Sequence, residues 1–122
     1  MNQLLIVFLG GGLGTVFRFM IGKLLPYSGE GFPWSTFWAN LIGCLLIGVF
    51  SGYIIRNADH NQSSIILFAT VGFCGGFTTF SSFANENLTF IRTGDYLMLF
   101  GYTLLSLVLM VYLGILIEKY FH

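Results

Sequence analysis

Four long apolar segments account for most of this chain, and they leave few folds open to it. The segments cover residues 4–25, 34–56, 65–91 and 96–118. About 20 apolar residues suffice for a helix to cross a bilayer, so each segment is long enough to form a transmembrane helix. A helix satisfies its own backbone hydrogen bonds in hydrocarbon, whereas an open sheet cannot. The sequence therefore predicts an all-α membrane protein with four transmembrane helices.

Charged residues are scarce along the whole chain. They make up 8% of the 122 residues, whereas soluble domains carry about a quarter. Because the composition does not change along the chain, we expect residues 1–122 to form a single four-helix transmembrane domain in the lipid bilayer. Five basic and five acidic residues give a net charge of zero, which excludes the basic field that binding to nucleic acid requires.

The third segment contains a stretch, residues 72–83, that is unusual for a membrane helix. It combines three glycines with four hydroxyl side chains. Such residues weaken a helix, and the segment is longer than one straight span requires. We therefore expect the third helix to be broken at its middle. A broken helix at membrane depth indicates an ion or substrate site, although the glycines alone would also suit a close contact between helices.

Several polar side chains inside the spans are candidates for an ion path. Arg18 either snorkels toward the helix end near Lys23 or anchors a vestibule that anions can reach. Asn40 either bridges two helices or donates a hydrogen bond to a passing anion. Tyr102 and Ser106 share one face of the fourth helix and are either packed hydroxyls or part of a polar path.

Residue spacing predicts several local features. Gly10 and Gly14 lie four residues apart and favour close helix packing. Gly94 is a plausible end for the third helix, and Asp95 a plausible cap for the fourth. One helix face is expected to carry Thr79, Ser82, Phe83 and Glu86.

Cysteine and histidine give no sign of a metal centre or an enzyme. Cys44 and Cys74 lie in apolar segments without paired spacing, so we expect both to be small buried hydrophobes. His60 and His122 have no partner at metal-ligand spacing and are expected to be solvated. No nucleophile, base and orienting group can be assembled from these residues, so we do not expect an enzyme.

The charges at the ends of the spans do not specify an orientation in the membrane. Arg56 and Lys119 flank one side, and Lys23 and Arg92 flank the other. The positive-inside rule therefore gives a tie, and two identical chains could pair antiparallel. Four short helices also enclose little space, so a homodimer would supply the missing wall of a polar path.

Two other functional classes fit parts of the pattern. A proton-coupled exporter of the small multidrug-resistance type also has four spans, but it would want a carboxylate deep in a helix. The first helix has none, and Glu86 lies toward the end of the third. A structural membrane subunit would explain the glycines but not the concentration of hydroxyl and phenylalanine side chains.

The chain resembles the Fluc/CrcB family of fluoride channels over nearly its whole length. The resemblance rests on Gly11-Gly12-Leu13-Gly14 through Arg18, on Pro33 to Asn40 with Gly43, and above all on residues 72–83 followed by Glu86. It implies a passive, fluoride-selective ion channel in a bacterial inner (plasma) membrane, which exports fluoride and protects the cell from its toxicity. It also implies an antiparallel, dual-topology homodimer with two pores.

The resemblance further implies roles for individual residues. Asn40, Phe80 and Phe83 would line the fluoride path, with Thr79 and Ser82 as added hydroxyl donors. Tyr102 and Ser106 resemble the family's polar track, and Arg18 would sit at the vestibule. A structural sodium ion would be held by the backbone carbonyls of Gly75 and Thr78 from both chains. Thr15, Phe19 and Ser35 stand where alanine, tyrosine and glycine are common in the family.

Overall fold

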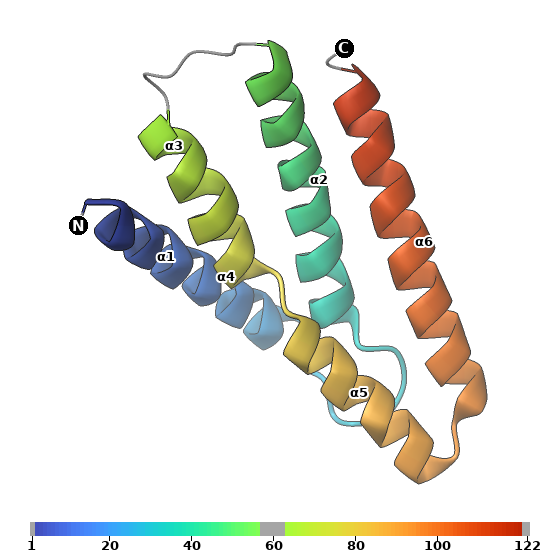
Figure 1. Ribbon diagram of the computed structural model, residues 1–122. Coiled ribbons are helices and arrows are strands. Elements are labelled where there is room, and N and C mark those ends of the chain that lie inside the picture. Colours follow the sequence, from blue (N-terminus) through green and yellow to red (C-terminus); the bar gives the residue numbers. More distant parts are fainter. Residues whose placement is uncertain (1, 57–62, 121–122) are drawn as a thin grey trace.

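The computed structural model describes residues 2–56 and 63–120, and there the chain is helical apart from short connections. The elements are α1 (Asn2–Leu24), α2 (Trp34–Arg56), α3 (Ser63–Leu67), the π-helix η2 (Phe68–Cys74), α4 (Gly75–Phe77), α5 (Phe80–Thr93) and α6 (Tyr96–Tyr120). They provide four spans long and apolar enough to cross a membrane, the third running from Ser64 to Thr93 (Figure 1). This confirms a multi-pass, all-α membrane protein.

Glycine residues bring α1 into backbone contact with the first half of the third span. A Cβ atom at Gly10 would lie 2.6 Å from the carbonyl oxygen of Phe68, and one at Gly14 would lie 2.8 Å from the amide nitrogen of Phe77. On the facing helix, a Cβ at Gly76 would overlap the carbonyl of Gly11. The prediction of close packing at Gly10 and Gly14 is therefore confirmed.

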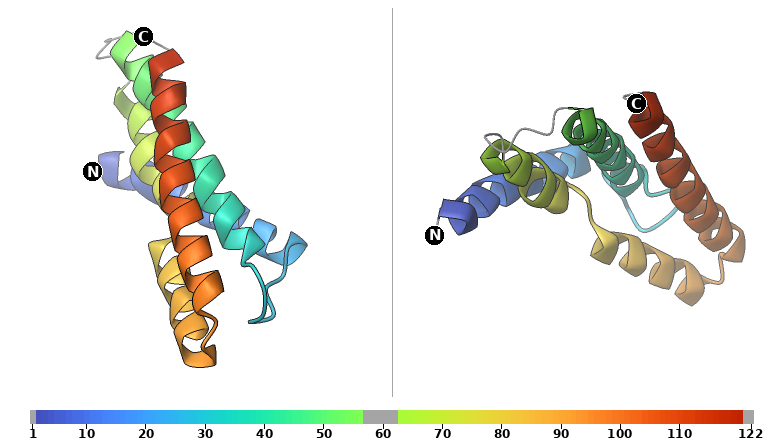
Figure 2. Two further views of the ribbon diagram at one scale, coloured as in Figure 1. Left: turned by 90° about the vertical axis from the view of Figure 1, so that its right-hand side faces the viewer. Right: turned by 45° about the horizontal axis from the view of Figure 1, so that its top comes forward.

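The third span opens at Thr78 and Thr79. Both residues are extended, with φ/ψ of −84°/155° and −147°/111°, whereas the residues on either side are helical. The glycines of this stretch stay within η2 and α4. The hydroxyl residues therefore carry the opening, while Gly72 and Gly76 serve the contact with α1. Figure 2 shows α3 and α4 running beside α1, while α5 diverges toward α6.

The other half of the molecule is built from α2, α5 and α6. A small core joins these three helices through Phe37, Leu41, Phe90 and Tyr102. Gly94 ends α5 with a positive φ of 75°, and the Asp95 carboxylate accepts a hydrogen bond from the Met98 amide at 3.2 Å. The predicted helix end and cap are both confirmed.

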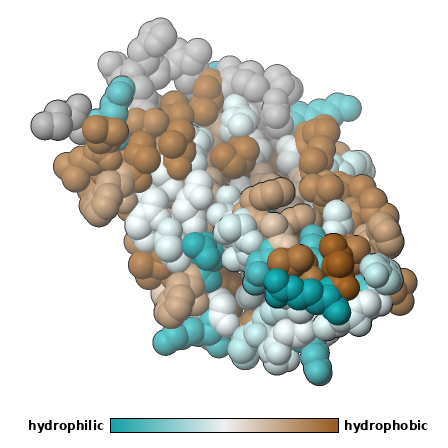
Figure 3. All heavy atoms as spheres, turned by 60° about the horizontal axis from the view of Figure 1, so that its bottom comes forward, coloured by the Kyte–Doolittle hydropathy of each residue, from teal (hydrophilic) through white to brown (hydrophobic). Residues whose placement is uncertain are grey.

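Most of the apolar surface is left uncovered by the chain itself. In the 18-residue apolar stretch of each span, between 11% and 33% of the residues are buried. Figure 3 shows hydrophilic side chains gathered toward the end that carries the α5–α6 turn, with hydrophobic side chains along the flanks. Lipid or another protein chain must cover these flanks, because exposed apolar area of this extent is unfavourable in water.

Candidate ion path

Asn40 on α2 holds the break in place. Its Oδ1 accepts a hydrogen bond from the Thr79 amide at 2.7 Å, and its Nδ2 donates to the Thr79 carbonyl at 3.1 Å. The Thr79 hydroxyl then caps α5 by accepting from the Ser82 amide at 3.1 Å. Asn40 thus bridges two helices, which was one of the alternatives the sequence allowed. Within residues 2–56 and 63–120, its Nδ2 makes this one hydrogen bond, so its second hydrogen is available to another acceptor.

Several backbone carbonyls lose their helical partners at the break, those of Gly75 and Thr78 among them. In a continuous helix, the carbonyl of Gly75 would accept from the Thr79 amide, and that of Thr78 from the Ser82 amide. Those two amides bond to Asn40 and to the Thr79 hydroxyl instead. Gly75 is also exposed, with open space where a side chain would be. Freed carbonyls at a broken helix fit a small cation such as sodium.

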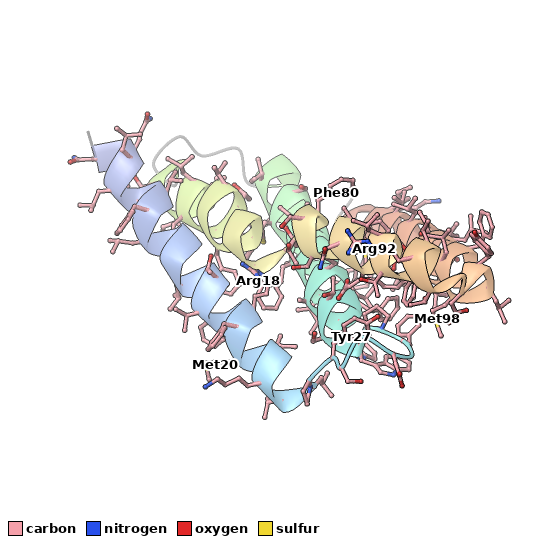
Figure 4. The ribbon with its side chains drawn as sticks, turned by 90° about the horizontal axis from the view of Figure 1, so that it is seen from below. Arg18, Met20, Tyr27, Phe80, Arg92 and Met98 are labelled. Carbon is pink, nitrogen blue, oxygen red and sulfur yellow. The ribbon has the colours of Figure 1, made fainter. Side chains whose placement is uncertain are left out.

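Arg18 on α1 reaches the same break from the opposite side. Its Nε donates a hydrogen bond to the Gly76 carbonyl at 3.1 Å. Figure 4 shows the side chain extending from α1 toward the junction of α4 and α5, where Phe80 begins the second half of the span. The guanidinium therefore turns inward to the break rather than along α1 toward Lys23.

A buried carboxylate lies on α5, about two helical turns beyond the break. Glu86 is 7% exposed and accepts hydrogen bonds from the Thr36 hydroxyl at 2.7 Å and from the Tyr102 hydroxyl at 2.9 Å. Sequence reasoning missed Thr36. Its position four residues before Asn40, on the same face of α2, was the signal that could have identified it.

Two cavities lie on opposite sides of the break. The first, which we call the groove, has a volume of about 470 Å³ and is lined by α2, α6, the break and the start of α5. The second, the vestibule, has a volume of about 390 Å³ between α1, α2 and α5. The groove is lined by residues that include Asn40, Phe80, Phe83 and Ser106, and the vestibule by residues that include Arg18, Lys23, Thr36, Ser82 and Glu86. Thr79 lines both cavities.

The α5 helix forms a wall between these cavities, and its side chains divide accordingly. Phe83 lines the groove, whereas Ser82 and Glu86 line the vestibule. Phe83 and Glu86 nevertheless both contact Tyr102 of α6, the first through its ring and the second through its carboxylate, so the predicted shared face is confirmed for these two residues. A helix between two cavities presents neighbouring positions of its inner surface to each of them.

The groove contains the exposed aromatic and the unsatisfied hydroxyl of the site. Phe80 is 78% exposed, and its ring centroid lies 5.9 Å from that of Phe83. Ser106 is 1% exposed, and its hydroxyl has no hydrogen-bond partner within the described part of the chain. Tyr102 is 0% exposed and directs its hydroxyl to Glu86.

The cysteines occupy different environments. Cys74 is buried, as predicted, but Cys44 is half-buried and lines the groove. The expectation that both are buried is wrong for Cys44, because this residue lines the groove and is covered on one side only. His60 and His122 lie outside the described residues.

Tyr27, in the connection between α1 and α2, is a further residue that sequence reasoning missed. Its hydroxyl is buried without a hydrogen-bond partner among the residues described. Burial, together with the negative charges of Glu86 and Asp95, raises the pKa of this phenol above its ordinary value of 10.0.

Comparison with known proteins agrees with the resemblance. A model of the family described as "CrcB-like protein, Camphor Resistance (CrcB)" matches residues 5–116. A protein named "Fluoride-specific ion channel FluC" from Phocaeicola vulgatus is 46% identical over 110 residues, which cover 89% of each chain. A protein of the same name from Gloeothece citriformis is 44% identical, over 88% of this chain and 86% of its own. Another from Bacteroides fragilis is 40% identical, over 89% of this chain and 87% of its own. This chain belongs to the CrcB-like family.

Proposed function

We propose that this protein is a passive, fluoride-selective channel that exports fluoride down its gradient and protects the cell from fluoride toxicity. The names of its relatives support fluoride as the ion. One observation above all supports a channel: Thr79 lines both the vestibule and the groove. The opened backbone lies where the two cavities meet, and an opened backbone is tolerated at membrane depth where it lines a polar path.

The vestibule has the charges that would attract an anion. Arg18 and Lys23 of α1 both line it, as does Glu86 of α5. The carboxylate of Glu86 is occupied by two hydroxyl donors, whereas the two basic side chains raise the local concentration of small anions. Fluoride that enters the vestibule then meets Thr79 and Ser82 at the break.

The groove offers donors without fixed charge. Fluoride is small and strongly hydrated, so a pore must replace its water with hydrogen-bond donors and positive edges. Asn40, Thr79 and Ser106 carry such donors, and the rings of Phe80 and Phe83 carry positive edges. None of the described residues that line the groove is charged, so the anion is stabilised there without being trapped.

The active unit in this proposal is an antiparallel homodimer with two pores. A single chain leaves Phe80 78% exposed and the groove open, so a second copy is needed to complete the wall. The tie in flanking charges allows the two copies to insert in opposite orientations. Crosslinking that traps parallel pairs alone would refute this arrangement.

A structural sodium ion at the break completes the proposal. The carbonyls of Gly75 and Thr78 from both chains would hold it, and it would supply a fixed positive charge beside the path. The freed state of these two carbonyls supports the assignment, because a cation would replace the hydrogen bonds that they lose.

The test is fluoride efflux from liposomes that contain the purified protein, with chloride as the comparison anion and no proton or sodium gradient. We expect rapid fluoride efflux and little chloride efflux. Efflux that requires an imposed proton gradient would instead support the exporter of the small multidrug-resistance type, with Glu86 as its carboxylate. Absence of any transport would refute both.

A further inference from the structure

The α6 wall of the groove loses its hydrogen-bond donors beyond Ser106. Met110 and Gly114 follow Ser106 at intervals of four residues and also line the groove. Neither has a side-chain donor. The Ser106 hydroxyl is buried and has no partner among the described residues. Because buried hydroxyls are normally hydrogen-bonded, this one is available to hydrogen-bond an ion or water in the groove. On the α6 wall, the row of side-chain donors available to an anion therefore ends at Ser106.

The adjoining α2 wall supplies donors over the remaining length. Cys44 and Ser51 lie seven residues apart on α2, so they share one face, and both line the groove. Both are half-buried. At a rise of 1.5 Å per residue, the eleven residues from Asn40 to Ser51 correspond to about 16 Å of helix. The α2 face thus continues from the break toward the membrane side at which α2 ends with Arg56.

We propose that an anion moving between the break and the Arg56 end of α2 travels along the groove, with the Cys44 thiol and the Ser51 hydroxyl as its donors. The proposal rests on the channel function above and adds to it two residues of the conduction path. Neutral donors suit this position, because they bind the anion weakly enough for it to leave. Silver ion is a suitable probe, since a soft thiol-seeking cation bound at Cys44 would obstruct the groove.

The experiment is fluoride efflux from chloride-free liposomes that contain the full-length protein, with and without silver ion. Cys74 is the built-in control, because it is 2% exposed and lies outside the residues that line either cavity. We expect silver to block the wild type and C74A at least tenfold. C44A should conduct less than the wild type, because it lacks one donor, and silver should not lower its efflux further. C44S provides a second thiol-free variant should C44A fold poorly. S51A should lower efflux about tenfold, the effect of one lost hydrogen bond, whereas S64A, at an exposed serine outside both cavities, should conduct normally.

Silver block that persists in both C44A and C44S would overturn the role of Cys44, as would an unblocked wild type. Efflux at the wild-type rate from S51A would overturn the role of Ser51. These results are distinguishable from failure of the channel function itself, in which the untreated wild type releases no fluoride. Elution of every variant at the wild-type position in size-exclusion chromatography verifies assembly.

Discussion

Replacement of Gly10 by alanine should separate α1 from the third span. The new Cβ atom would lie 2.6 Å from the Phe68 carbonyl oxygen, whereas ordinary contacts begin at 3.4 Å. The obstacle is backbone, so relief requires the helices to move apart by about 0.8 Å. Overpacking of this kind costs about 1–3 kcal/mol.

Gly12 is the matched control for this substitution. It lies two residues farther along α1, and no atom would come within 4 Å of a Cβ there. Both replacements gain the helix propensity of alanine, about 1 kcal/mol, so their difference isolates the helix contact. We expect Gly10→Ala to be less stable than Gly12→Ala by about 1–3 kcal/mol.

The measurement is the free energy of unfolding in detergent micelles, with fluoride efflux from liposomes as the functional readout. We expect Gly12→Ala to retain efflux and Gly10→Ala to lose most of it, because α1 positions Arg18 at the break. Equal stability and equal efflux of the two variants would refute the reasoning that glycine is required for backbone contact at this seam.

Three further predictions concern the break and its surroundings. Asn40→Ala removes both hydrogen bonds to Thr79 and should cost about 1–3 kcal/mol; Asn40→Gln with wild-type unfolding and efflux would contradict a specific role for this geometry. Phe80→Ile and Phe83→Ile should each abolish fluoride efflux while the protein elutes unchanged in size-exclusion chromatography, and undiminished efflux in either would count against the pore assignment. Because the pKa of Tyr27 is raised on folding, the neutral phenol stabilises the folded state, and this contribution is lost as the pH rises above 10; Tyr27→Phe should lose less stability than the wild type over that range, measured as unfolding at pH 9 and at pH 11.

Much of the fold follows from local sequence. The lengths of the apolar segments predict the four spans, because hydrophobic thickness sets the length of a membrane helix. Gly94 and Asp95 predict the end of α5 and the cap of α6, because both depend on the conformation of one or two residues. The stretch at residues 72–83 predicts a break, since its composition is unfavourable for a continuous helix.

The same stretch shows where local reasoning ends. Composition could not separate Gly72 and Gly76, which contact α1, from Thr78 and Thr79, which open the helix. That division depends on which surface of the third span faces α1. The fluoride assignment came from resemblance to a family, and its pore residues remain predictions.

Tertiary structure alone decided how the site is assembled. Asn40 and Thr79 are 39 positions apart, and Thr36 and Glu86 are 50 apart. Hydropathy and spacing report the neighbours of a residue along its own helix, so they could not pair these side chains or reveal that Thr79 lines two cavities. Such contacts arise from the angle and depth at which helices cross, and those are set by packing across the whole bundle.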